Sequence, residues 1–543
     1  MEQRIRADLV LKNGRILTMD AEDRTARAAA IHGERIAAVG SEEEILPFVG
    51  RETKVLDLKG ATVLPGLIDT HAHFSRIGPL VATNALLYDC TSVGEVIARL
   101  IEYRERVPDG APILGRGDCY FETHFEEQRQ ICAADLDRVA TDRAVVISDV
   151  NKTIVNSYAL DHCVAYDAAP PGIQLPMDER TGRPTGMFFS GARAMVKAPA
   201  FSIELLPEAA TRASSAQFAA YGVTTVADPG PSSEFIRTYR AMGDAGKLST
   251  RVVIMPSTHL VDRPEFREKF PHYGTEGPCY RFGPAKQFYD GFVMHRTAYM
   301  YKAYPGEPEH FGSTSISLKE LRVRVERTWT AGWPLGIHVT GNRALVEAAH
   351  VMAEVCRPIA SGRSHSIHAY FPTPEALRIH VEAGLGVAAQ PGFLRAWGET
   401  LKRFLGKERA FRFLPLRTYL EAGVIVGGGS DAPVVHWNPF RGMGTAVDRE
   451  TLAGEHLGER ESLTPWEVLA LYTKHAAKVL DMDGEIGSIE PGKMADLIVV
   501  DRDVLTCSGA ELARTQVEWT MVSGRIVYRQ AISDQRSAKP QKP

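Results

Sequence analysis

The sequence predicts an α/β protein built on a (β/α)8 barrel, with a small β-sandwich domain formed from both chain termini and a long insertion after the first barrel strand. Three observations support this fold class. Short apolar segments alternate with helix-like segments through the middle of the chain, which is typical of a parallel sheet. Strand-like stretches occur near both ends. An unusually long stretch separates the first two strand segments of the middle region, and a connection of that length must carry structure of its own.

Eight segments in the middle of the chain have the composition of short buried strands and end in polar or glycine-rich positions. Eight is the number of strands that closes a parallel barrel. An open doubly wound sheet produces a similar alternation, so the number alone leaves that alternative open. We expect the strands within Gly66–His73, Gly222–Pro229, Arg251–Ser257, Ala285–Gly291, Pro334–Gly341, Ser364–Tyr370, Gly386–Pro391 and Val424–Asp431.

The two ends of the chain resemble each other in composition, with short strands around Asn-Gly, His-Gly and Ser-Gly turns. Hairpins at either end are too small to be stable alone, so we expect them to pair into one β-domain made of residues 1–60 and 485–530. The barrel then occupies residues 61–484, with the insertion at about 80–215 covering its mouth. The polar segment 531–543 is predicted to be a flexible tail.

Composition excludes several classes of function. The 63 basic and 67 acidic residues give a formal charge of −4, without the basic cluster that nucleic acid or an anionic membrane would need. The seven cysteines form no CxxC pair, which favours reduced thiols. Neither a signal peptide nor an apolar segment long enough to span a membrane is evident. We therefore expect a cytoplasmic enzyme with a small-molecule substrate and with neither nucleic acid nor membrane as a partner.

The strongest chemical signal is the segment from Pro65 to Phe74, in which an apolar strand ends in His71-Ala72-His73. Residues two apart on a strand point to the same side, so both imidazoles can reach one ion. The carboxyl end of a barrel strand is also where such enzymes place their chemistry. Taken alone, His-x-His is equally compatible with two polar residues that simply end a strand.

Other residues in the predicted strands favour a metal site over two polar residues that simply end a strand. His338 and His368 lie within later strand segments, and Asp431 ends the last one. In a barrel these side chains would converge with the first two histidines on one point. Imidazole and carboxylate together suit Zn²⁺ or a similar divalent ion.

With these motifs the sequence resembles the amidohydrolase superfamily. The resemblance extends in order over nearly the whole chain and includes Ser430-Asp431-Ala432-Pro433 and the segment from Gly487 to Leu497. Within the superfamily the chain looks most like amidohydrolase family 3, the YtcJ-like proteins that include N-substituted formamide deformylases. That closer likeness rests on the long insertion and on the segments Lys286–Gly291, Gly341–Ala344 and Asn156–Leu160.

The resemblance implies one or two divalent ions per subunit, with Zn²⁺ expected, held by His71, His73, Lys286, His338, His368 and Asp431. It implies hydrolysis of a C–N bond of an amide type by a metal-activated hydroxide. Asp431 would be both ligand and proton shuttle, and His338 would help to hold the oxyanion. Relatives also lead us to expect a homodimer.

Lys286 needs a separate explanation, because an ammonium group cannot bind a cation. The resemblance suggests that CO2 converts this lysine to a carbamate that bridges two metals. The alternative is an unmodified lysine in an ordinary ion pair, for which Asp290 is the nearest acid in the sequence.

Candidate substrate contacts follow from position beside these motifs. The Tyr289 neighbourhood and the insertion suggest a covered, partly apolar pocket, which favours an acyl or aryl amide. Two alternatives remain at this stage: a cyclic amide or imide hydrolase, deaminase or ester/lactone hydrolase on the same scaffold, and a non-catalytic metal-binding regulatory protein. The candidate substrate-binding residues are His295, Tyr289, Arg296, Asn342 and Gln390.

Overall fold

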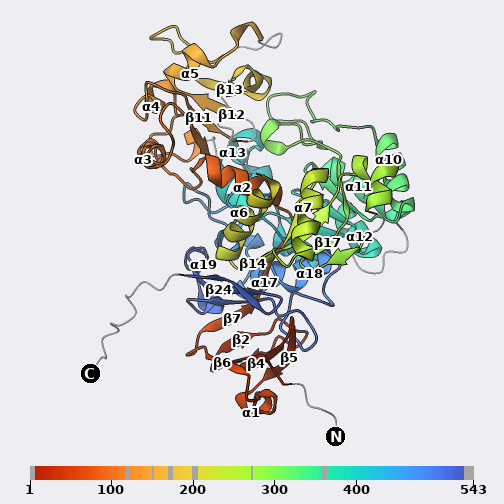
Figure 1. Cartoon of the computed structure of the whole chain (residues 1–543). Coiled ribbons are helices and arrows are strands. Elements are labelled where there is room, and N and C mark those ends of the chain that lie inside the picture. Colours follow the sequence, from red (N-terminus) through yellow and green to blue (C-terminus); the bar gives the residue numbers. More distant parts are fainter. Residues whose placement is uncertain are drawn as a thin grey trace.

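A computed structural model describes residues 6–117, 121–149, 152–168, 175–197, 206–270, 273–356 and 364–530. The predicted flexible tail, 531–543, lies outside these ranges. Sheets made from the two ends of the chain lie at one end of the molecule, and the helices and strands of the insertion lie at the other, with the remaining strands and helices between them (Figure 1).

Two five-stranded sheets form the middle of the molecule, and each of the eight segments predicted to hold a strand contains one. The pairs β8–β14, β14–β15 and all neighbours from β18 to β22 are parallel. The sheets have the orders β16 (Glu276–Gly277), β17 (Tyr280–Phe282), β15 (Arg251–Met255), β14 (Val223–Pro229), β8 (Leu67–Asp69) and β18 (Ala285–Phe288), β19 (Leu335–Val339), β20 (His365–His368), β21 (Gly386–Ala389), β22 (Val426–Gly428).

Hydrogen bonds join the two sheets on both sides. The amide of Thr70, just after β8, donates to the carbonyl of Gly428 in β22 at 3.0 Å. The amide of Lys286 in β18 donates to the carbonyl of Pro256, just after β15, at 2.8 Å. The carboxyl ends of all eight strands therefore face one common region, as a parallel arrangement requires.

Helices follow the strands and cover them on the outside. Many begin with a capping side chain, such as Ser232 before α7 and Thr373 before α12, whose oxygen accepts from the first turn. In the described part of the chain, none of the helices combines the length and apolar character that a membrane span requires. They are α2 (Phe74–Thr83), α6 (Pro207–Ala220), α7 (Ser233–Asp244), α8 (Thr258–Val261), α9 (Pro264–Lys269), α10 (Leu318–Thr330), α11 (Asn342–Val355), α12 (Pro374–Ala383), α13 (Gly392–Leu405), α14 (Lys407–Ala410), α15 (Leu416–Glu421), α16 (Pro439–Asp448), α17 (Pro465–Leu471) and α18 (Lys474–Val479).

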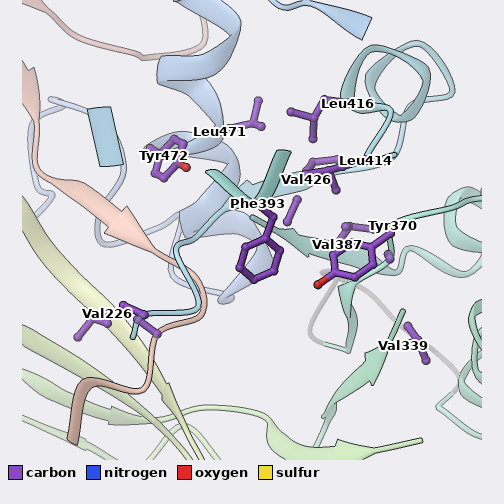
Figure 2. Packing of buried hydrophobic residues seen from close by; sticks show 14 of the residues in the cluster. Val226, Val339, Tyr370, Val387, Phe393, Leu414, Leu416, Val426, Leu471 and Tyr472 are labelled. Carbon is purple, nitrogen blue, oxygen red and sulfur yellow. The ribbon is translucent and has the colours of Figure 1, made fainter. Parts of the chain in front are cut away.

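One large apolar core packs these helices against the strands. Figure 2 shows part of it, with Val387 and Val426 on neighbouring strands and Phe393 from α13 beside Val426. Burial of such side chains stabilises the fold by about 25 cal/mol per Å² of apolar surface removed from water. This packing fixes the strand ends that carry the site.

The chain termini form two further sheets. The pairing of β7 with β23 joins the N-terminal and C-terminal parts directly, with Val63 opposite Val499. Residues of both sheets, such as Leu11 and Trp519, meet in one core. The orders are β5 (Arg35–Gly40), β4 (Ala28–His32), β1 (Leu9–Lys12), β6 (Lys54–Asp57) and β25 (Arg525–Arg529), β24 (Val517–Val522), β23 (Leu497–Val500), β7 (Thr62–Pro65), β2 (Arg15–Leu17), β3 (Thr25–Ala26), with α1 (Glu42–Ile45) and α19 (Gly509–Leu512) beside them.

One predicted hairpin is wrong. Strands β1 and β2 flank Asn13-Gly14, but β1 pairs with β4 and β6, whereas β2 pairs with β3 and β7. The turn therefore carries the chain from one sheet to the other. A Cβ at Gly14 would lie 2.6 Å from Leu58 Cδ1, so the close approach of that side chain explains the glycine.

The insertion has a sheet and an apolar core of its own, as its length predicted. Hydrogen bonds between Thr123 and Thr400 and between Arg403 and Glu122 hold it against α13. Its sheet has the order β13 (Met187–Phe189), β12 (Lys152–Val155), β11 (Val145–Ser148), β10 (Ile113–Arg116), β9 (Ala85–Leu86), and its helices are α3 (Val93–Arg104), α4 (Ala133–Leu136) and α5 (Ser157–His162).

A buried ion pair connects the terminal sheets to the strands of the middle region. Arg251 in β15 pairs with Asp496, and both side chains are nearly inaccessible, at 6% and 4% exposed. Arg251 also donates to Ser523 Oγ at 3.0 Å. Removing one partner leaves the other charge buried without compensation.

We therefore predict that Arg251→Met lowers the free energy of unfolding by about 3–5 kcal/mol, measured by urea denaturation. Arg324→Met is the matched control, because Arg324 forms an exposed ion pair with Glu320 one turn away in α10; its expected cost is under about 1 kcal/mol. If both variants lost the same free energy of unfolding, the buried ion pair would have no special structural role.

Candidate metal centre

The residues predicted to bind metal lie within strands of the middle sheets or just beyond the carboxyl ends of those strands. His71 and His73 follow β8, and Asp431 follows β22. Lys286, His338 and His368 lie within β18, β19 and β20. Because the strands run in parallel, six residues that are far apart in the sequence come to the same side of the molecule.

Three of these residues form a compact group. The nearest donor atoms of His71, His73 and Asp431 lie within 4.8 Å of one another. Asp431 Oδ1 is 3.4 Å from the Nε2 atoms of both histidines. This oxygen is buried and has no hydrogen-bond partner in the described structure. A buried carboxylate oxygen facing two imidazole nitrogens fits a divalent cation, since the cation would satisfy all three.

His338 and His368 are held so that one ring nitrogen of each is committed to the protein. His338 Nε2 lies 2.8 Å from the carbonyl of Gly291, and His368 Nδ1 lies 2.7 Å from Gln390 Oε1. Both partners accept, so these nitrogens carry the protons and the opposite nitrogens keep their lone pairs. The two rings are 4.5 Å apart, and the His368 ring is 5.3 Å from that of His71.

Burial keeps these imidazoles neutral. Desolvation lowers the pKa of His71 to about 3, and the nearby Lys286 adds to the effect. Desolvation and Lys286 likewise lower the pKa of His338 to about 3. For Asp431, burial would raise the pKa of the carboxyl, but the imidazoles of His71 and His73 close to it outweigh burial and hold the pKa well below its usual range. Neutral imidazoles and an ionised carboxylate are the forms that bind metals.

Lys286 is buried, at 2% exposed, and in the described ranges no carboxylate oxygen lies within ion-pair distance of its Nζ. Desolvation lowers the pKa of this lysine to about 7, against an opposing effect of Asp431. The alternative partner, Asp290, is occupied elsewhere. Its carboxylate accepts from the amides of Thr340 at 2.9 Å and Gly341 at 2.8 Å. The ion pair considered as an alternative for Lys286 is therefore not formed.

Asp69 ties two of the site's segments together. Its carboxylate accepts from the amide of His71 and the amide of Ser430, both at 3.0 Å, and from Ser430 Oγ at 2.6 Å. It thereby fixes the end of β8 against the segment that carries Asp431. An acid that holds a ligand-bearing segment in this way orients the metal-binding side chains.

Two positioning residues were missed in the sequence. Asp290 also accepts from the amide of Tyr299 at 2.9 Å, so it binds three amides from two backbone segments near the Gly291 carbonyl that contacts His338. Asp228, at the end of β14, accepts from Tyr239 Oη at 2.7 Å and from the amide of Ser75 in the helix after His73. A strand ending in an acid is the signal that could have identified both.

The five predicted substrate contacts have other neighbours in the structure. Gln390 holds His368, and Tyr289 donates to Glu347 of α11. Asn342 accepts from the amide of Tyr301 at 2.9 Å, and Arg296 pairs with Glu307. His295 keeps a buried Nε2 without a hydrogen bond, and its ring contacts that of Phe292.

Phe288, which was not among the predicted contacts, also lies beside the metal-binding candidates. Its side chain is on the same side of β18 as Lys286, and it is half-exposed at 50%. Its ring centroid is 5.0 Å from that of His338 and 4.6 Å from Lys286 Nζ. Behind it, aromatic contacts continue from Phe292 to Trp397 at 5.1 Å and from Trp397 to Phe393 at 3.9 Å.

Comparison with known proteins agrees with this architecture. The family model described as "Amidohydrolase family" matches residues 54–528, so the chain belongs to the amidohydrolase family. An N-substituted formamide deformylase from Arthrobacter pascens is 29% identical over 96% of this chain and 98% of its own. A putative amidohydrolase, YtcJ, from Bacillus subtilis is 26% identical over 95% and 98%.

Among solved structures, an uncharacterized metal-dependent hydrolase from Pyrococcus horikoshii has a TM-score of 0.70, with 22% identity over 92% of this chain and 99% of that one. At this level of identity, the likeness shows that the two proteins share a fold. In the part of the chain that the structure describes, the group of His71, His73 and Asp431 has the donor atoms and spacing to hold a metal ion.

Proposed function

We propose that the protein is a metal-dependent hydrolase that cleaves the C–N bond of an N-substituted amide with an apolar substituent. The proposal includes a closed (β/α)8 barrel with a β-sandwich made from the two chain ends, Zn²⁺ as the metal, and a carbamate on Lys286. The observation that carries it is the compact group of His71, His73 and Asp431 beside two imidazoles whose ring protons point away.

A divalent ion bound by this group would supply Lewis-acid activation of the carbonyl and of a water molecule. The protein's own residues do the rest. Asp431 accepts the proton of the attacking water and passes it to the leaving nitrogen, because its Oδ1 is the uncommitted oxygen at the centre of the group. Gly291 and Gln390 hold His338 and His368 in the tautomers that leave their lone pairs available.

Phe288 supports the choice of an apolar substituent. A large aromatic side chain that is half-exposed beside the candidate ligands leaves apolar area in water, and an apolar group of the substrate would cover it. The name of the relative from Arthrobacter pascens, an N-substituted formamide deformylase, is consistent with such a substrate.

The test combines metal analysis with a panel of N-benzyl and N-alkyl formamides and acetamides, a cyclic imide, a lactone and a nucleoside. We expect divalent metal in the purified protein and turnover of the open-chain amides, with kcat/KM highest for aromatic substituents. Turnover of only the cyclic imide, lactone or nucleoside would replace the proposal by another hydrolase reaction. A metal-loaded protein inactive on all of them would favour a binding function.

Phe288→Ala sharpens this test. We expect KM for an N-benzyl amide to rise about tenfold, the equivalent of 1.4 kcal/mol, with a smaller change for an N-methyl amide. Leu318→Ala is the control, because Leu318 is similarly exposed at 43% but begins the outer helix α10. An equal rise for both substrates would show that Phe288 does not contact the substituent.

A further inference from the structure

A cavity lies behind the segment that carries Asp431. Its volume is about 40 Å³, and it is partly open to solvent. Its walls come from the start of the insertion, the segment after β22, and the first turns of α13 and α16. The residues on which its chemistry depends are Tyr88, Asp89, Arg395, Ser430, His436 and Arg441.

The cavity holds more positive than negative charge. Asp89 pairs with Arg441, and its other oxygen is 3.9 Å from Arg395 Nε. Within the described residues these are the only partners of the two guanidinium groups, so one carboxylate serves two arginines. Glu450 raises the pKa of Arg395 and Arg514 lowers it, and desolvation has a larger effect than either.

Both arginine side chains are partly buried, at 34% exposed for Arg395 and 35% for Arg441. Desolvation lowers the pKa of Arg395 and of Arg441 from the usual arginine value. A guanidinium group has five N–H donors, so two of them offer ten, far more than the oxygens of Asp89 can accept. An anion in the cavity would accept from the donors that Asp89 does not reach.

Two helix ends reinforce this charge. The fourteen-residue helix α13 begins at Gly392 without a side-chain cap, and α16 begins at Pro439; both residues line the cavity. The N-terminus of a helix carries a partial positive charge and attracts anions. The helix ends add to the arginines and would not make a site without them.

We propose that this cavity binds a small anion through a carboxylate or phosphate group held by Arg395 and Arg441. Both groups present paired oxygens that match the planar guanidinium fork. The site is separate from the metal-binding candidates and does not depend on the proposed hydrolase activity. It does share their framework, since a Cβ at Gly429, in the cavity wall, would lie 2.9 Å from both Asp69 Oδ1 and the amide of His71.

The experiment is thermal unfolding of the metal-loaded protein in potassium phosphate, potassium acetate and potassium chloride at matched ionic strength. A ligand that binds only the folded state raises Tm in a saturable way. We expect a rise of several degrees with phosphate or acetate but not with chloride, and the anion that saturates at the lower concentration identifies the group.

Arg395→Gln should weaken the response at least tenfold, whereas the matched control Arg378→Gln should leave it unchanged, because Arg378 pairs with Glu382 on the exposed surface of α12. A response that persists in Arg395→Gln would place the anion at the metal centre and overturn the proposal, as would the lack of any saturable response. If Arg395→Gln does not fold, a crystal of the unaltered protein soaked in selenate decides the question. Anomalous density between Arg395 and Arg441 supports the site, and its absence overturns it.

Discussion

Asp431→Asn is expected to lower kcat by about 10²–10⁴-fold while leaving the fold intact, which is the range found when general acid–base catalysis is lost. Asparagine has nearly the same shape but cannot accept the proton of the attacking water. The carboxylate is well placed for this transfer, since Oδ1 is buried, 3.4 Å from Nε2 of both His71 and His73, and without a hydrogen bond in the described structure.

The measurement is kcat and KM on the best amide, together with metal content and thermal unfolding for each protein. Asp262→Asn is the matched control, because Asp262 is an exposed residue at the end of α8, far along the chain from the strand ends that carry the site. A metal-loaded Asp431→Asn variant that keeps kcat within tenfold of the parent would exclude Asp431 as the proton carrier.

The barrel strands could be predicted from the sequence because each is a short apolar run that ends in polar or glycine-rich residues. Val223–Pro229 and Leu335–Val339 are buried at every position, as expected for strands covered on both sides. The connection at Asn13-Gly14 was misjudged because a local turn signal does not say which sheet the next strand joins. That choice depends on packing between residues distant in the chain.

The site could be predicted to the level of its donor residues, because histidines and acids at strand ends are visible as spacing. The groups that orient these donor residues could not be predicted in this way. Asp290 acts by accepting backbone amides from residues 299, 340 and 341, and no side-chain pattern reveals such contacts. The predicted substrate contacts Tyr289 and Asn342 point instead to Glu347 and to the Tyr301 backbone, since a residue beside a motif can face either way.

The second large effect is expected for Lys286, which is buried with a pKa lowered to about 7 by desolvation. A neutral amine can attack CO2, and loss of one proton then leaves a carbamate, an anion suited to the positive charge of bound metal. If that carbamate is a ligand, Lys286→Ala should lower kcat by about 10²-fold or more and reduce the metal bound per chain.

Short carboxylic acids such as propionate should restore part of this activity, because in Lys286→Ala they can occupy the space and supply the missing oxygens. Lys286→Gln leaves no such space, so its activity should not respond to propionate. Both variants keep the cavity lined by Arg395 and Arg441, so an effect of propionate at that cavity would be the same in both. Lys152→Ala, which removes another buried lysine paired with Glu122 at 3.5 Å, should lose stability without being rescued. If Lys286→Ala retained full metal and kcat within tenfold, the lysine would be a structural residue. Loss of activity without rescue, but with bound metal unchanged, would assign it a role through charge alone.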